Sequence, residues 1–383
     1  MKIRSLLALV LVCSLTVLAA AQDKPVLSPD LAKGLAAIQG TAAYGYVKQL
    51  SSPAFAGRLT GSPGFAAAAK WAAGLFKQWG LKPLDAKTGY LQPFPSPYTI
   101  IKSADLTLFA PGDAAGRKFE ANKDFLPLLF SDSGKIEAGL VFAGWGISAP
   151  DLGYDDYAGL DVKGKIVICF RGQPALGDPR LQHHDEHRTR MKTALDKGAV
   201  GLFYIYPEPI SNPNGDWLKG FLPAMISEKA ADSILKEAGT TSADLKKILQ
   251  TFKKPLSFAL QSRVRYAVEA EHHAEGIGYN VVGYVEGADP ALRKDVIVIG
   301  GHLDHNGLHM GFLFPGANDN ASGSATVMEI GRAYSLLARK PKRSVAFVLF
   351  GGEEMGLQGS TYLSEHIPAP FARVDGMFNF DMT

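Results

Sequence analysis

The chain has 383 residues, of which 46% are hydrophobic and 20% charged, and its formal net charge is +3. This composition is typical of a globular protein, and the length suffices for one large domain or two ordinary ones. No basic run interleaved with aromatic residues occurs, so the sequence does not indicate a nucleic-acid partner. Oligomeric state is left open.

Residues 1–21 have the pattern of a secretory signal peptide. Lys2 and Arg4 precede an apolar stretch over residues 6–18, which is too short to span a bilayer comfortably. An A-x-A pattern then predicts cleavage before Gln22. We therefore expect a secreted or periplasmic protein that has no membrane attachment after cleavage. An uncleaved membrane anchor is the less favoured alternative.

The two cysteines give a further constraint. Cys13 lies in the predicted signal peptide and would leave with it, whereas Cys169 lies in an apolar run typical of a buried strand. A single remaining thiol cannot form an internal disulfide, so the exported protein is expected to be stable without one.

The rest of the chain divides into three segments. Residues 22–127 carry helical spacing, including a helix start at Ser62-Pro63. Residues 128–270 contain several short apolar strands separated by turns, which predicts a small β-rich unit. Residues 271–383 carry longer apolar runs, typical of strands buried in a parallel sheet. We interpret residues 128–270 as a domain inserted into an α/β domain with a mostly parallel, helix-flanked sheet.

A glycine-rich segment, AGRLTGSPG, surrounds Arg58 in the first segment. Such a loop could place Arg58 against a substrate. Loops of this kind more often pack over a domain edge, and we favour that interpretation.

Three apolar runs in the last segment each end in residues able to bind a metal. Because ligands of open α/β sheets lie beyond the carboxyl ends of the strands, these residues should converge on one rim. They are His302, Asp304, Glu353, Glu354 and Asp381, with Asp319 supplied by the loop between. The alternative for Asp319 and Asn320 is a simple helix N-cap. For the adjacent Glu353 and Glu354, the alternative is a solvated surface pair.

These ligand types also suggest a chemistry. Nitrogen and oxygen ligands without cysteine suit Zn²⁺, with Mn²⁺ or Co²⁺ also possible. Two cations bridged by one carboxylate would lie about 3.5–4 Å apart and could hold both the attacking and the leaving oxygen. A carboxylate that does not bind metal could accept the proton of the attacking water. One glutamate of the pair fits that role and the other fits metal binding.

The motifs HLD, GANDNASG, GGEEMGLQGS and NFDM together resemble the signature of the M28 family of zinc aminopeptidases. The segment VFAGWGISAPDLGYDDYAGLDVKGKIVICFRG resembles a protease-associated (PA) domain, which is commonly inserted in that family. The resemblance implies a zinc-exopeptidase fold with two Zn²⁺ ions. It implies that His302, Glu354 and Asp381 bind zinc and that Asp319 bridges the two ions. Glu353 would be the general base, and Asp304 would orient His302. It also implies a cis peptide bond between Asp319 and Asn320.

The function implied by the resemblance is hydrolysis of N-terminal residues from peptides through a water that bridges the two metals. A related carboxypeptidase or glutaminyl cyclase is an alternative on the same scaffold, although the inserted domain argues against the cyclase. A non-catalytic PA/peptidase-like binding protein is an alternative of another class. The preferred N-terminal residue is not revealed by the sequence.

The family supplies a last histidine ligand well downstream of the NxDM motif, whereas this sequence stops at Thr383. We therefore expect either that the C-terminal part of the peptidase fold is missing from this sequence or that one metal site is incomplete. His305 and His309 are close enough in sequence to be considered as substitutes, but no pattern supports them, and we predict that both are loop residues.

A second histidine-rich motif, HHDEH over residues 183–187, matches the H-x-x-E-H pattern of inverted zinc proteases. That pattern requires a helix and a distant third ligand. A short motif without this context is weak, so we predict a solvated, histidine-rich loop instead.

Overall fold

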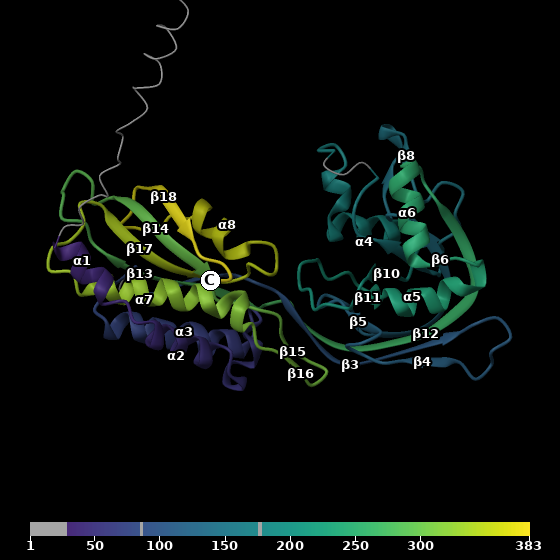
Figure 1. Cartoon of the computed structure of the whole chain (residues 1–383), viewed down its shortest axis with the longest axis horizontal. Helices are drawn as coiled ribbons and strands as arrows, with labels where there is room; N and C mark the ends of the chain where they lie inside the picture. The colour runs from purple at the N-terminus through teal and green to yellow at the C-terminus, as the bar shows by residue number, and fades with distance from the viewer. Residues whose placement is uncertain (1–28, 85–86, 175–177) are drawn as a thin grey trace, which may run out of the picture.

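The computed structural model describes residues 29–84, 87–174 and 178–383. The predicted signal peptide lies outside these ranges. None of the helices in the described ranges is both long and apolar enough to cross a bilayer. The chain forms two units, each built on its own sheet, and it passes between them just before β3 (Tyr98–Phe109) and just after β12 (Ser257–His273) (Figure 1).

The first unit contains a six-stranded sheet in the order β1-β13-β17-β14-β18, with β2 also paired to β13. Its strands are β1 (Lys82–Pro83), β2 (Leu91–Pro95), β13 (Ile277–Val285), β14 (Asp295–His302), β17 (Ser344–Phe350) and β18 (Arg373–Asn379). Strand β14 is parallel to β17 and β18, whereas β13 is antiparallel to β1, β2 and β17.

The sheet is therefore mixed, which corrects the expectation of a mostly parallel one. The apolar runs that suggested a parallel sheet are indeed the three parallel neighbours β14, β17 and β18. Strand β13 returns directly from the second unit and pairs with the other side of β17, adding an antiparallel part to the sheet, as is common in large α/β sheets.

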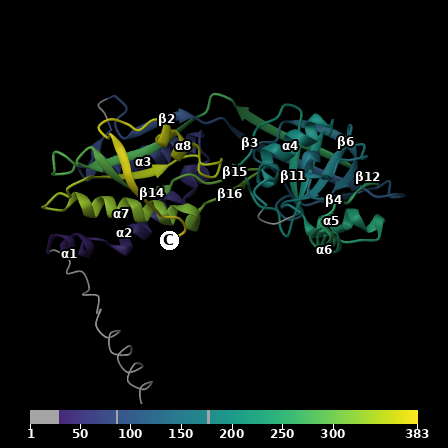
Figure 2. The same ribbon diagram turned by 90° about the horizontal axis from the view of Figure 1, so that it is seen from above.

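Helices cover both faces of this sheet. The helices are α1 (Pro29–Ala36), α2 (Gly40–Leu50), α3 (Pro63–Gln78), α7 (Gly323–Ser335) and α8 (Gln358–Glu365). Apolar side chains of α2, α3 and α7 pack with one face of β13, β14 and β17, and α8 packs on the other face through Leu363. Figure 2 shows these helices as layers on either side of the strands. The predicted helix start is confirmed, because Ser62 Oγ accepts a hydrogen bond from the Phe65 amide and Pro63 is the first residue of α3.

The second unit contains an eight-stranded sheet in the order β4-β3-β12-β6-β9-β10-β11-β5. Its strands are β3 (Tyr98–Phe109), β4 (Arg117–Phe119), β5 (Phe125–Pro127), β6 (Gly134–Ala143), β9 (Ile166–Phe170), β10 (Gly201–Tyr206), β11 (Leu222–Ser227) and β12 (Ser257–His273). Its helices are α4 (His187–Asp196), α5 (Glu228–Leu235) and α6 (Ser242–Phe252). Two small hairpins complete the named strands: β7 (Ser148–Ala149) with β8 (Tyr154–Asp155), and β15 (Gly307–His309) with β16 (Phe312–Phe314).

The second unit begins earlier than the predicted boundary at residue 128. Strands β3, β4 and β5 all precede that residue and belong to the eight-stranded sheet. The pairing of β3 with β12, which is distant in sequence, decides this assignment, and no local pattern in residues 98–127 indicates that partner. Cys169 lies buried in β9 and is free, as expected.

Candidate metal centre

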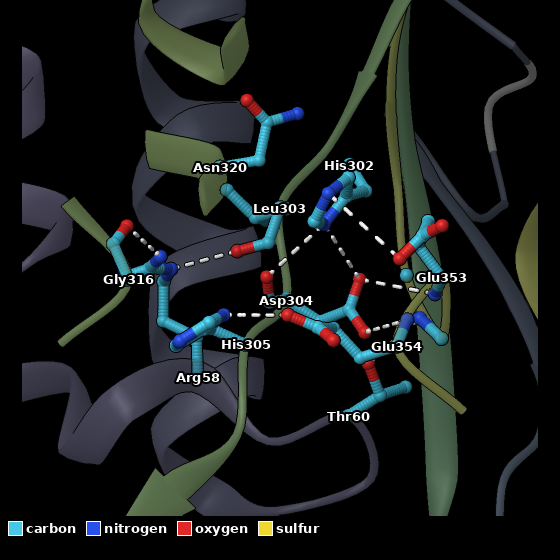
Figure 3. Close-up of polar contacts among 12 residues, drawn as sticks. Arg58, Thr60, His302, Leu303, Asp304, His305, Gly316, Asn320, Glu353 and Glu354 are labelled. Carbon is cyan, nitrogen blue, oxygen red and sulfur yellow. Dashed lines mark hydrogen bonds and ion pairs between the residues drawn. The ribbon is translucent and has the colours of Figure 1, made fainter. Parts of the chain in front are cut away.

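The parallel arrangement of β14, β17 and β18 brings the predicted residues to one edge of the first sheet. Strand β14 ends at His302, and Asp304 follows two residues later. The loop after β17 carries Glu353 and Glu354, and Asp381 follows β18. Since neighbouring parallel strands end at the same edge, these side chains meet there. Figure 3 shows His302, Glu353 and Glu354 at this edge.

His302 lies at the middle of a group of carboxylates. Its Nε2 atom is 3.2 Å from Asp319 Oδ1, 3.5 Å from Asp381 Oδ1 and 3.8 Å from Glu353 Oε2. Two ligand atoms about 2.1 Å from a tetrahedral zinc lie about 3.4 Å apart, so the first two distances suit a shared metal ion. We call His302, Asp319 and Asp381 the His302 group.

Asp304 connects the ends of two strands. Its Oδ1 atom lies 3.7 Å from His302 Nδ1, and its backbone oxygen is closer to the same nitrogen, at 3.2 Å. The two carboxylate oxygens also accept hydrogen bonds from the amides of Glu353 and Glu354, at 3.2 and 3.3 Å. Asp304 is therefore fully buried next to His302 and also fixes the backbone of the glutamate pair (Figure 3).

Asp319 does not cap helix α7. Its backbone is extended, with φ −101° and ψ 105°, and its carboxylate is directed to His302. The neighbouring Asn320 takes the structural role, because its side chain accepts from the amides of Gly323 and Met382 and donates to the Phe380 oxygen. The N-cap alternative is thus wrong for Asp319. The peptide bond between Asp319 and Asn320 is cis, as the resemblance implied.

A second group of possible ligands adjoins the first and shares Asp319 with it. His305, Asp319 and Glu354 have ligand atoms within 4.8 Å of one another, and we call them the His305 group. His305 Nδ1 lies 2.6 Å from Glu354 Oε1. His305 lies in the loop between β14 and β15, as predicted, and its side chain contacts the candidate ligand Glu354. The prediction that His309 is a loop residue is wrong, because His309 is buried in β15, where its ring nitrogens contact the Ile101 amide and the Asn306 oxygen.

The electrostatics of the site follow from this crowding. Burial lowers the pKa of His302, but the hydrogen-bonding and charge of Asp304 and the charges of Glu353 and Asp319 outweigh it and raise the pKa to about 9. Burial raises the pKa of Glu353 to about 7, with His302 opposing the shift and the neighbouring carboxylates adding to it. A carboxyl group with a pKa near neutrality can both accept and return a proton.

Two residues under the site were not predicted to support it. Arg58 is fully buried with φ 55°, and its guanidinium donates to the backbone oxygens of Leu303, Leu50, Pro315 and Gly316. Thr60 Oγ1 accepts from the Gly352 amide at 2.8 Å. Contact of Arg58 with a substrate is therefore excluded, and the favoured packing interpretation is correct. In the sequence, Arg58 stands out only as a lone arginine in a glycine-rich loop, and this pattern does not reveal the partners of its guanidinium.

The HHDEH motif forms no comparable group. Residues 182–185 form a 3₁₀ turn, and helix α4 begins only at His187, so the histidines do not share a helix. His183 is exposed as predicted, whereas His187 is buried, which corrects the expectation of a fully solvated loop.

The donor set at the sheet edge fits a divalent metal. It consists of imidazole nitrogens and carboxylate oxygens, its spacing in the His302 group suits a tetrahedral ion, and a crowd of carboxylates is expensive to bury without a cation. An α/β sheet that carries such a group beyond its parallel strand ends is typical of metal-dependent hydrolases.

Comparison with known proteins gives a family match for the last part of the chain. Residues 280–383 match the model of peptidase family M28. The leupeptin-inactivating enzyme 1 of Streptomyces exfoliatus is 40% identical over 106 residues, which are 27% of this chain and 22% of that protein. The match to this family model is confined to residues 280–383, and the chain spans between 22% and 50% of the length of the first curated relatives it matches.

Two solved structures share the fold. The aminopeptidase from Aneurinibacillus sp. strain AM-1 superposes with a TM-score of 0.60 at 22% identity, covering 92% of this chain and 72% of that one. BSAP, a zinc aminopeptidase from Bacillus subtilis, gives a TM-score of 0.57 at 22% identity, covering 90% of this chain and 69% of that one.

Proposed function

We propose that this chain is an exported zinc-dependent aminopeptidase that removes N-terminal residues from peptides. The observation that carries the proposal is the convergence of His302, Asp319, Asp381 and Glu353 at one sheet edge in an M28 segment. The relatives described as aminopeptidases, one of them a zinc enzyme, support the same activity and metal.

His302 and Asp381 would hold one ion, Glu354 would hold a second, and Asp319 lies in both groups and would bridge them. Zinc bound there lowers the pKa of a bound water and polarises a carbonyl group. His302 must be neutral to bind metal, so its proton leaves when the ion enters.

Glu353 is the proposed general base. Its side chain lies beside the His302 group, with Oε2 at 3.8 Å from His302 Nε2, and burial raises its pKa to about 7. Its carboxylate accepts a proton from the attacking water and then passes it to the leaving amine. Asp304 keeps His302 and the backbone of Glu353 in place during this transfer.

The second unit is proposed to be a PA domain inserted in the peptidase domain, and residues 1–21 a cleaved signal peptide. The insertion is supported by the topology, because the chain leaves the first sheet after β2 and returns to it with β13, next to β2. Export is supported by the sequence pattern alone.

The proposed activity is tested with amino-acyl anilides, which have a free α-amine, against the same anilides with a blocked amine. Zinc-loaded protein should hydrolyse the free amines only, and chelator-treated protein neither. Preferred cleavage of N-blocked peptides from the carboxyl end would indicate a carboxypeptidase. Zinc binding without hydrolysis of any peptide would support the non-catalytic alternative.

A further inference from the structure

One contact in the His305 group has a geometry different from those in the His302 group. His305 Nδ1 lies 2.6 Å from Glu354 Oε1. Two atoms that bind the same tetrahedral zinc would be about 3.4 Å apart, as the atoms around His302 nearly are. A separation of 2.6 Å is instead that of a short, charge-assisted hydrogen bond.

The chemistry of the pair fixes the direction of this hydrogen bond. An ionised carboxylate only accepts hydrogen bonds, so Nδ1 of His305 must donate its hydrogen to Oε1 of Glu354. One oxygen of Glu354 is thereby engaged, and the other remains available to a metal. The side chains are 15% and 17% exposed, so water competes little for the contact.

The surroundings hold the His305 ring in this position. The His305 amide donates to the backbone oxygen of Arg58 at 3.1 Å, and Arg58 is itself fixed by four carbonyl groups. The ring lies directly against Gly316, where a Cβ atom would come within 2.5 Å of His305 Cγ. Figure 3 shows His305 between Arg58 and Glu354. The buried arginine thus orients the histidine, and the histidine contacts the glutamate.

We propose that His305 is a positioning residue for the second metal of the centre: it holds Glu354 so that a single carboxylate oxygen faces Asp319 and the ion. The proposal rests on the proposed function for the presence of two metals. Partners that hydrogen-bond to ligating carboxylates typically change metal affinity or activity by about 10- to 100-fold when removed.

The test compares His305→Ala with His305→Asn. Asparagine carries its nitrogen at the same distance from the backbone as Nδ1 of histidine, so it can still donate to Glu354, but an amide is a poor ligand for zinc or cobalt. The metal-free full chain is titrated with Co²⁺ by calorimetry and visible absorption. His183→Ala, at an exposed histidine of the second unit, is the matched control.

We expect two binding events in the wild-type protein and in the control. In His305→Ala one event should weaken by about 10- to 100-fold and the other should stay unchanged. His305→Asn should bind both ions within a few-fold of wild type. Thermal unfolding of metal-free His305→Ala should remain a single cooperative transition, as in the wild type, which separates a loss of orientation from a loss of folding.

Three results would overturn the proposal. Unchanged binding by His305→Ala would show that the contact does not matter for the metal. Equal weakening in the alanine and asparagine variants would show that His305 binds the ion itself. A wild-type protein with a single binding event would remove the second metal altogether. Hydrolysis of amino-acyl anilides by the wild-type protein, measured in parallel, tests the proposed activity separately from all three.

Discussion

Two segments of this molecule combine histidines with acidic residues, and they differ in what surrounds them. In residues 302–305, His302 faces carboxylates, and its pKa is raised to about 9 despite burial. In residues 183–187, burial and the guanidinium groups of Arg171 and Arg190 lower the pKa of His187 to about 3. Histidines and acidic residues therefore favour a positive charge around His302, whereas the surroundings of His187 disfavour one.

The difference arises from the partners of the acidic residues. Asp185 is paired with Arg190 at 2.7 Å and with Arg171 at 3.1 Å, so its charge is already balanced. Arg171 also donates to Nε2 of His187 at 2.8 Å, which requires a neutral ring. Near His302, the guanidinium of Arg58 is engaged by backbone oxygens. Uncompensated carboxylates, rather than histidines, distinguish the candidate metal centre.

The largest expected effect concerns Glu353, the proposed general base beside His302. Glu353→Gln keeps the size and the loop but cannot accept a proton, so kcat should fall by about 10²- to 10⁴-fold on amino-acyl anilides. Metal content, measured by elemental analysis, should stay at the wild-type value. Turnover within tenfold of wild type would show that another group is the base.

The comparison itself is tested by paired histidine changes. His302→Ala removes a proposed ligand. It should weaken metal binding more than the loss of a residue that only hydrogen-bonds to a ligand, which typically costs about 10- to 100-fold. His187→Gln, in the second segment, should leave metal binding unchanged in the same titration. Metal binding that depends on His187 would reverse the assignment of the two segments.

The charge balance of the second segment predicts a stability effect. Asp185→Asn leaves the fully buried Arg190 without its carboxylate and should lower the free energy of unfolding by about 3 kcal/mol. The control is Asp178→Asn, since the pair of Asp178 with the exposed Arg180 should contribute nothing measurable. Urea denaturation of both variants measures the difference. Equal stability of the two variants would show that Arg190 finds other compensation.

The smallest effect is a pH dependence. The folded pKa of His187, about 3, lies below its unfolded value of about 6.5, so the unfolded chain binds a proton first as the pH falls. The contribution of this group to the free energy of unfolding is complete above pH 6.5 and is lost between pH 6.5 and 3. By pH 5 the loss amounts to about 2 kcal/mol. His187→Gln should show a correspondingly flatter dependence in denaturation curves at pH 7 and pH 5. Parallel curves for the two proteins would contradict the low pKa.

Sequence alone was sufficient for the residues at strand ends. Apolar runs that finish in His302, Glu353 and Asp381 predict a shared edge because parallel strands end together, and the structure places them there. The helix start at Ser62 was likewise predicted from local chemistry.

Contacts between distant segments were not predictable in this way. The pairing of β3 with β12 moved the domain boundary, and the return of β13 made the sheet mixed. His305 and Arg58 were missed as parts of the centre because their roles depend on Glu354 and on the carbonyls of residues 303–316, which lie up to 258 positions away. Sequence patterns report which residues end an element, but the hydrogen bonds that fix a site require the folded arrangement.

The most direct test of the central claim is an anomalous-scattering map of crystals of the full chain grown with zinc. The account predicts strong peaks at the edge of the first sheet, one between His302, Asp319 and Asp381 and one next to Glu354 and Asp319. It predicts no peak among residues 183–187. Zinc found only in that histidine-rich segment, or no zinc at the sheet edge, would contradict the assignment of this edge as the metal centre.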